Sequence, residues 1–184
     1  NFDKIRRTLD VPKGKLILEY IETLGQENST KLKRHLAALE EELAAQARVA
    51  RGAASLLNYL RTMGYDLAIL TRNTRANALL TLQTIGLLSY FQTQLIIGRE
   101  ETTPKPSKDG VVRLLRQMNG TVSKAVIVGD HRIDLETGTN SGISTIHICG
   151  DAQRTWSALT DYRFPTLSAL LKALGKNMPD ERDK

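Results

Sequence analysis

From residue 66 onward, short apolar runs alternate with longer amphipathic segments. The runs at 67–70, 96–97 and 125–128 contain no polar residue, and a fourth run follows at 144–149. Strands that are apolar on both faces are typical of a parallel sheet that helices cover on both sides. Strands that alternate with helices give the parallel connections such a sheet needs. The sequence therefore predicts an α/β fold with a parallel sheet.

The segments between these runs have helical spacing of their apolar residues. We expect helices over 75–85, 107–118 and 133–139. The run at 162–164 indicates a short last strand, which a helix over about 166–174 follows.

The first part of the chain shows no strand pattern. Its apolar residues recur at helical spacing over 11–24, 29–48 and 53–63, and glycines follow the first and third of these segments. We therefore predict a small helical domain at about 1–50 and an α/β domain at 51–184.

The net charge of +6 does not by itself indicate a nucleic-acid partner, because the charge is spread along the 184 residues. The only dense basic cluster is Lys31, Lys33 and Arg34, and the acidic run 40–42 follows it on the same predicted helix. A helix face of mixed charge is usually solvated. We expect no nucleic-acid binding.

No stretch of about 18 apolar residues occurs, so the sequence predicts no membrane-spanning helix. It shows no secretory signal pattern. The single cysteine, Cys149, cannot form an internal disulfide, which fits a reducing compartment. These features predict a cytoplasmic protein.

Polar side chains follow three of the apolar runs at their carboxyl ends. They are Thr71, Arg72 and Asn73 after the first run, Lys105 in the loop after the second, and Asp130 and Asp134 after the third. In an open parallel sheet, ligands bind beyond the carboxyl ends of the strands. The order predicts one hydroxyl, one ammonium and two carboxylates at a common edge.

Each of these residues has a simpler explanation when taken alone. Thr71 or Asp130 could cap the helix that follows it. Lys105 could be a solvated loop residue, and Asp134 could lie in a first helical turn, where the helix dipole favours a carboxylate. The ordered set is more specific than any of its members.

Three segments carry a resemblance to a known family. "LAILTRN", the "KP" at 105–106 and "VIVGDHRIDLETGTNSGIST" resemble the second, third and fourth motifs of the haloacid dehalogenase-like (HAD) hydrolases. The opening "NFDKIRRTLDVPKGKLILEYIETL" resembles the start of the helical cap in phosphoglycolate-phosphatase-like members. The resemblance covers essentially the whole chain. It implies a Rossmann-like parallel sheet core with a small N-terminal helical cap.

The resemblance also implies an activity. Such proteins are Mg²⁺-dependent phosphomonoester hydrolases that act on small phosphorylated metabolites through a phosphoaspartate intermediate. It implies that the Asp130 carboxylate binds Mg²⁺. Asp134 is implied at the same metal site, where it binds the ion through water or orients the groups around it. The implied catalytic residues are Thr71, Asn73, Lys105 and Asp134; those at the substrate phosphate are Thr71, Arg72 and Lys105.

The chain departs from the family pattern at its first motif. In the family, a central strand ends in Asp-x-Asp-Gly-Thr, whose first Asp is the nucleophile and whose second is the general acid and base. No Asp-x-Asp occurs in the 184 residues. A parallel sheet without its central strand would leave two apolar strands facing a gap. We therefore expect this strand upstream of Asn1.

Other interpretations remain. A chain that has lost the nucleophile would be a non-catalytic HAD-like binding or regulatory protein. Response-regulator receivers also place Thr, Lys and Asp around a phosphate, but their acidic residues precede the Thr and Lys. Phosphomutases and haloacid dehalogenases share the HAD fold. The dehalogenase reaction requires no Mg²⁺, so the two carboxylates of "GDHRID" weigh against that activity. Neither the substrate nor the oligomeric state follows from the sequence.

Overall fold

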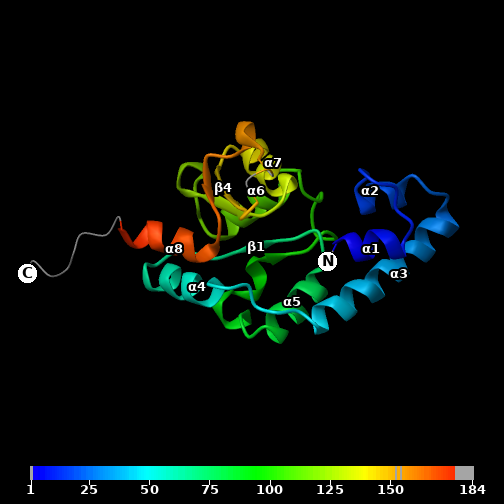
Figure 1. Cartoon of the computed structure of the whole chain (residues 1–184), viewed down its shortest axis with the longest axis horizontal. Coiled ribbons are helices and arrows are strands. Elements are labelled where there is room, and N and C mark those ends of the chain that lie inside the picture. The colour runs from blue at the N-terminus through cyan, green and yellow to red at the C-terminus, as the bar shows by residue number, and fades with distance from the viewer. Residues whose placement is uncertain (1, 152, 154, 177–184) are drawn as a thin grey trace, which may run out of the picture. The chain divides into compact units, whose positions relative to one another are not determined.

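The computed structural model describes residues 2–151, 153 and 155–176. Its contacts divide the chain after Ala47 into two compact units. Figure 1 shows the helices of the first unit in blue and the strands and helices of the second from cyan to red.

The first unit is built from three helices: α1 (Phe2–Thr8), α2 (Ile17–Glu22) and α3 (Gln26–Ala45). Apolar side chains from these helices and from the loop after α1 form its core. They are Ile5, Leu9, Val11, Ile17, Ile21 and Leu36. The helical character predicted for this region is therefore present, but the individual helices differ from the predicted ones.

The helix predicted over 11–24 forms only from Ile17 to Glu22. Residues 12–15 make a turn instead, in which the Lys15 N–H donates to the Pro12 carbonyl and Gly14 has a φ of +88°. A positive φ is incompatible with a right-handed helix and suits glycine. The Arg6 guanidinium holds this turn by donating to the Pro12 and Lys15 carbonyls at 3.0 and 2.7 Å.

The helix predicted over 29–48 begins earlier, at Gln26, and ends at Ala45. Gly25 occupies its N-cap position, so Ser29 and Thr30, which could have capped a helix beginning at residue 29, lie inside the helix. The Ser29 N–H already donates to the Gly25 carbonyl at 2.9 Å. Glu27 lies in the first turn, where the helix dipole favours a carboxylate.

The second unit has the predicted alternation of strands and helices. The elements are α4 (Ala53–Thr62), β1 (Ile69–Leu70), α5 (Arg75–Thr84), β2 (Ile96–Ile97), α6 (Asp109–Gln117), β3 (Val126–Gly129), α7 (Arg132–Ser141), β4 (Ser144–Ile148), β5 (Tyr162–Phe164) and α8 (Leu167–Lys176), with short 3₁₀ turns at Leu88–Tyr90, Thr93–Leu95, Val122–Lys124 and Ser157–Leu159. The predicted α/β class is confirmed.

The strand pairs in the described part of the chain are all parallel, but they form two separate ladders. β1 pairs with β2, while β3 pairs with β4 and β4 with β5. Val126 and Val128 of β3 are 49% and 43% exposed, which is unusual for a strand of a parallel sheet. The strands predicted as one sheet therefore leave β3 with one edge that none of the described residues pairs with, beside a face on which two valines are exposed.

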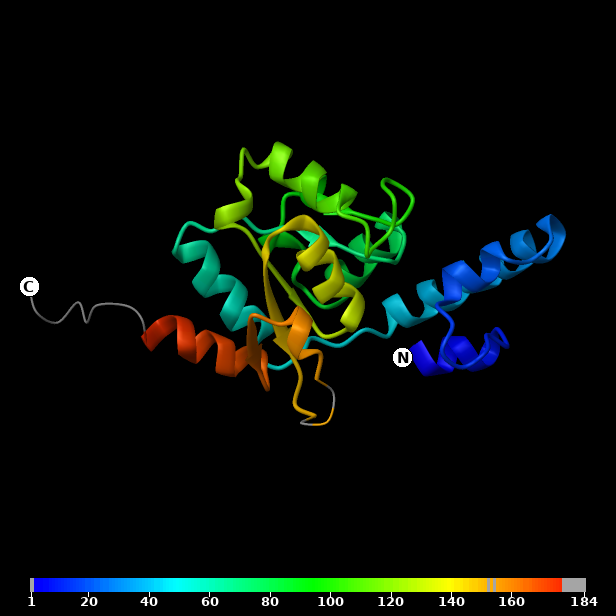
Figure 2. The ribbon, with the colours of Figure 1, turned by 90° about the horizontal axis from the view of Figure 1, so that it is seen from above.

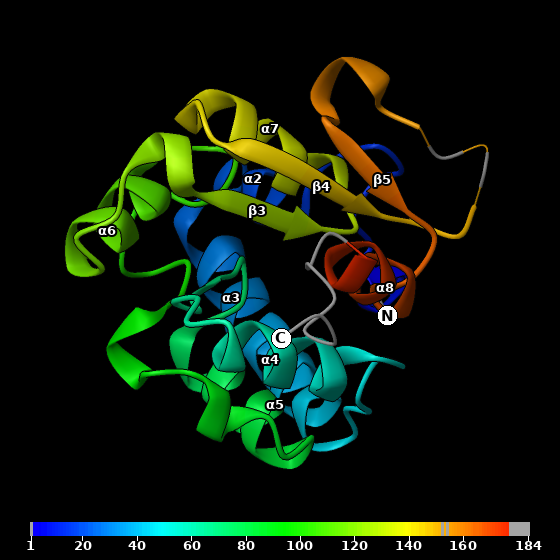
Figure 3. The same cartoon turned by 90° about the vertical axis from the view of Figure 1, so that its left-hand side faces the viewer.

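Helices lie on both sides of the strands in this unit. Figures 1 and 3 show α6 and α7 on one side and α4, α5 and α8 on the other. α7 packs on β3 and β4 and buries Leu135 completely. α4 packs beside α8, as Figure 2 shows from above. The loops that leave the carboxyl ends of β1, β2 and β3 carry the predicted site residues.

Candidate functional site

The loop after β1 carries Thr71, Arg72 and Asn73. The Thr71 N–H donates to the Ile97 carbonyl at 3.0 Å, so the pairing with β2 continues one residue beyond β1. The Thr71 hydroxyl oxygen accepts a hydrogen bond from the Asn73 N–H at 3.0 Å. Thr71 is therefore not a helix cap. Thr74 caps α5 instead, because its hydroxyl oxygen accepts from the Asn77 N–H at 3.2 Å.

The loop after β2 carries Lys105. Arg72 joins the two loops, since its guanidinium donates to the Lys105 carbonyl. Arg99 joins them a second time through a 3.0 Å hydrogen bond from its guanidinium to the Arg72 carbonyl. The Arg99 N–H also donates to the Asn73 carbonyl at 3.0 Å. The second and third motifs are therefore linked at both ends of the loop after β2.

The Lys105 ammonium lies against Asp134. Nζ of Lys105 is 2.5 Å from Oδ1 of Asp134, and the two side chains are only 12% and 13% exposed. A charge shielded from water to this degree is costly unless it has a partner. Each of these groups therefore depends on the other, although they are far apart in the sequence.

The second oxygen of Asp134 is engaged at the start of α7. Oδ2 accepts from the His131 N–H at 3.1 Å, and Nδ1 of His131 accepts from the Ile133 N–H at 3.3 Å. These reciprocal bonds form a capping box with His131 as the N-cap. The alternative that Asp130 caps this helix is therefore wrong, and His131 has the structural role instead.

Gly129, the last residue of β3, allows Asp134 to approach the strand. A Cβ at position 129 would lie 2.2 Å from the Asp134 Cβ and 2.6 Å from Oδ2. Both separations are shorter than any van der Waals contact between these atoms. The Gly-Asp of the fourth motif thus has a steric reason, since only glycine leaves room for the carboxylate.

Asp130 differs from Asp134 in being exposed. Among residues 2–151, 153 and 155–176 we find no hydrogen bond or ion pair of its carboxylate. The described residues contain no group of three or more His, Cys, Asp or Glu side chains that could hold a metal. Mg²⁺ does not need such a group, because one or two carboxylates with several waters suffice. The free oxygens of Asp130 fit that role better than those of Asp134, which are both occupied.

The predicted residues are connected to different degrees. Arg72, Lys105 and Asp134 form a continuous chain of contacts. Thr71 and Asn73 share one loop and one hydrogen bond. Asp130 is connected to these residues only by the backbone, because it lies between Gly129 and His131, the N-cap of α7.

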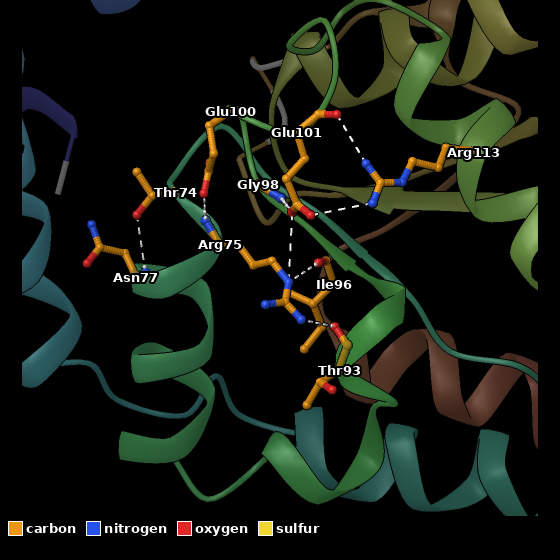
Figure 4. Close-up of polar contacts among 9 residues, drawn as sticks. All are labelled: Thr74, Arg75, Asn77, Thr93, Ile96, Gly98, Glu100, Glu101 and Arg113. Atoms are coloured by element: carbon orange, nitrogen blue, oxygen red, sulfur yellow. Dashed lines mark hydrogen bonds and ion pairs between the residues drawn. The ribbon is translucent and has the colours of Figure 1, made fainter.

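Residues around the loop after β2 were missed by the sequence analysis. Arg75, Glu100, Glu101 and Arg113 are joined by hydrogen bonds and ion pairs beside that loop, as Figure 4 shows. Only the two glutamates have a signal in the sequence, the "EE" at 100–101 shortly after the apolar run at 96–97. Two adjacent glutamates near the end of a buried strand could have been recognised as candidates for pairing, whereas no local pattern marks Arg75 or Arg113 as their partners.

Among the described residues, no helix is long and apolar enough to span a membrane.

Residues 2–148 match the model of a family described as haloacid dehalogenase-like hydrolases. The chain belongs to this family. The pyrophosphatase PpaX of Bacillus velezensis is 30% identical over 122 residues, which are 65% of this chain and 56% of that protein. The phosphoglycolate phosphatase of Rhodobacter capsulatus is 35% identical over 96 residues, 50% of this chain and 41% of that protein. The HAD chain thus spans about half the length of these relatives.

The fold of this HAD chain is also found in solved structures. The HAD-hydrolase YfnB of Bacillus subtilis, in a crystal form bound to magnesium, superimposes with a TM-score of 0.72 at 20% identity. The match covers 96% of this chain and 81% of YfnB. The predicted membership of the HAD hydrolases and the Rossmann-like fold are therefore confirmed.

Proposed function

We propose that this HAD protein is a Mg²⁺-dependent hydrolase of phosphomonoesters that acts on a small phosphorylated metabolite. The observation that carries the proposal is the Lys105 ammonium, which is held 2.5 Å from Asp134 and is tied through Arg72 to the loop of Thr71. This arrangement joins a cation, a hydroxyl and an acidic loop at the carboxyl ends of parallel strands.

The chemistry requires positive charge at this place. A carboxylate nucleophile that approaches a phosphate dianion at 4 Å is repelled by about 4 kcal/mol for each pair of unit charges at an effective dielectric of 20, so by roughly 8 kcal/mol in all. Lys105 contributes a cation held in a fixed place, which therefore needs little reorganisation during the reaction. Removal of Lys105 would leave this repulsion and the Asp134 charge without compensation.

Thr71 and its neighbours would bind the phosphoryl group. The Thr71 oxygen already accepts the Asn73 N–H, so its hydroxyl hydrogen is left to donate to a phosphoryl oxygen. Asn73 fixes the hydroxyl in this way. Arg72 adds positive charge beside Lys105.

Mg²⁺ would neutralise phosphoryl oxygens at the same edge. Asp130 supplies exposed carboxylate oxygens, and Asp134 acts through water or by orienting the loop, because its own oxygens contact Lys105 and His131. The crystal structure of YfnB, which has the same fold, is bound to magnesium, and this supports the proposed use of Mg²⁺ but not the choice of residues.

The nucleophile would come from a strand that pairs with the free edge of β3. Val126 and Val128 are exposed there, and β1 and β3 belong to separate ladders. A strand ending in Asp-x-Asp, placed between these ladders and upstream of residue 1, would pair with the free edge of β3, cover part of both valines and bring its first Asp to the edge that carries Lys105. Its carboxylate would attack the phosphorus and displace the alcohol of the substrate, which gives phosphoaspartate; water would then break the phosphoaspartate bond and release inorganic phosphate.

The names of the relatives support the proposed substrate class. One is named a pyrophosphatase and the other a phosphoglycolate phosphatase, and both names refer to small phosphorylated compounds. We extend only this common class to the HAD chain.

One assay tests the proposal. The full-length protein is incubated with p-nitrophenyl phosphate, phosphoglycolate and pyrophosphate, with Mg²⁺ and with EDTA. We expect phosphate release that requires Mg²⁺. Asp130→Asn should abolish the Mg²⁺-dependent rate and weaken Mg²⁺ binding in calorimetry. Activity that persists unchanged in this variant would remove Asp130 from the metal site.

The alternative is a non-catalytic HAD-like binding or regulatory protein. The observation that favours it is the lack of Asp-x-Asp in these 184 residues. A full-length protein that binds phosphate but releases none from any of the three substrates would support this alternative.

A further inference from the structure

A second polar cluster lies beside the loop that carries Lys105. We name Arg75, Glu101 and Arg113 the arginine–glutamate junction. They come from α5, from the loop after β2 and from α6, and Figure 4 shows their side chains pointing toward one another. None of the three has a role in the proposed chemistry.

Glu101 is the centre of the junction. Its Oε2 accepts from the Gly98 N–H at 2.8 Å and lies 3.9 Å from Nε of Arg75. Its Oε1 lies 3.5 Å from Nη2 of Arg113, and its backbone carbonyl accepts from Nη1 of the same arginine at 3.1 Å. One carboxylate thus connects the end of β2 with two helices.

Arg75 fixes the other side of the junction. Its guanidinium donates to the Ile96 and Thr93 carbonyls at 3.1 and 2.7 Å, and its N–H donates to a carboxylate oxygen of Glu100 at 2.9 Å. Gly98 lies so close to Arg75 that a Cβ on the glycine would be 2.2 Å from the Arg75 nitrogen. The loop after β2 therefore begins in close contact with the first residue of α5, whose three hydrogen bonds hold it there.

Only residues 102–104 separate Glu101 from Lys105. At the far end of this short segment, Arg72 holds the Lys105 carbonyl and Asp134 holds its ammonium. The segment is thus anchored at Glu101 on one side and at Lys105 on the other. A shift at Glu101 has few residues over which to be absorbed before it reaches Lys105.

We propose that Glu101 is a positioning residue for Lys105. It does not touch the reacting atoms; it sets the path of the loop so that the ammonium meets Asp134 and the phosphoryl group. The proposal rests on the proposed phosphatase function. Its energetic consequence is large, because misplacing a reacting group by about 1 Å can cost on the order of a hundredfold in rate.

A double-mutant cycle tests the coupling in the full-length protein. Glu101→Gln keeps the size of the side chain and removes its charge. We expect it to lower kcat by about tenfold or more in the natural protein, with KM changed less, and by less than about twofold in the Lys105→Ala background. An equal loss in both backgrounds overturns the proposal, because Glu101 would then act independently of Lys105.

Glu136→Gln is the matched control. Glu136 is 26% exposed against 23% for Glu101, and it also pairs with an arginine, Arg132, at 2.8 Å. The control should leave kcat and KM within about twofold of the natural values. If Glu101→Gln fails to fold, Arg113→Gln is measured in the same cycle, since the Arg113 side chain is 42% exposed.

An NMR measurement separates this proposal from the proposed function. Glu101→Gln should speed hydrogen exchange at the Gly98 N–H and shift the Lys105 Cε resonance, whereas Glu136→Gln should change neither. If the natural protein has no phosphatase activity, the proposed function is refuted. The Gly98 exchange rate and the Lys105 Cε shift then still test whether Glu101 positions Lys105. Unchanged Gly98 exchange and Lys105 Cε shift in Glu101→Gln overturn the positioning role.

Discussion

Gly129→Ala should disrupt the fold and the candidate site together. The new Cβ would lie 2.2 Å from the Asp134 Cβ, 2.5 Å from its Cγ and 2.6 Å from Oδ2. The carboxylate must then move until these separations exceed 3.0 Å, the shortest that real Cβ atoms show. Neither partner can yield easily, because one is in a strand and the other in the first turn of α7.

The expected cost follows from what Asp134 contacts. Overpacking costs about 1–3 kcal/mol, and loss of a helix cap costs about 1 kcal/mol. The hydrogen bond between Lys105 and Asp134 joins two charged groups, and such bonds contribute about 1.5–3 kcal/mol. Because these effects overlap, we expect unfolding to become easier by roughly 2–4 kcal/mol, or a Tm lower by about 5–15 °C.

Thermal and urea unfolding measure this change. Gly150→Ala is the control, since a Cβ at position 150 would meet its nearest neighbour, the Pro165 carbonyl, at an ordinary 3.6 Å. Its stability should stay within about 0.5 kcal/mol of that of the natural protein. A Gly129→Ala variant as stable as this control would refute the steric account of the Gly-Asp motif.

Two further changes test the framework of the second unit. Leu135→Ala should destabilise the protein by about 2–5 kcal/mol in urea unfolding, because this residue of α7 is fully buried where the helix packs on β3 and β4; Val122→Ala, at a residue 46% exposed, should cost far less, and equal costs would contradict the assigned packing. Thr74→Ala should cost about 1 kcal/mol through loss of the α5 cap, with Thr74→Ser restoring most of it, and no recovery in the serine variant would rule out a capping role.

Much of the second unit could be predicted from local patterns. The order of strands and helices, the end of α4 at Thr62 and the start of α5 at Arg75 agree with the predicted segments. These features depend on neighbouring residues, since periodicity, caps and glycines act over a few positions. The first unit was predicted less well, because Gly14 in a positive φ and the distant Arg6 together replace a helical turn by a loop.

The candidate site was predicted as a set of residues, but not as a set of contacts. Parallel strands bring their carboxyl ends to one edge, so the sequence alone indicated that Thr71, Lys105 and Asp130 follow such strands. It did not indicate that His131, rather than Asp130, caps α7. Two adjacent polar residues can both serve as caps, and only the direction in which the chain leaves β3 selects one of them.

The amino-acid sequence by itself determined the α/β class, the family and the types of side chain available for chemistry. The tertiary structure decided which of them meet. Lys105 and Asp134 are 29 residues apart, and Arg75 and Glu101 are brought together from α5 and the loop after β2. No local pattern encodes such pairs, because a contact between distant residues depends on how the strands between them are stacked and where their loops are anchored.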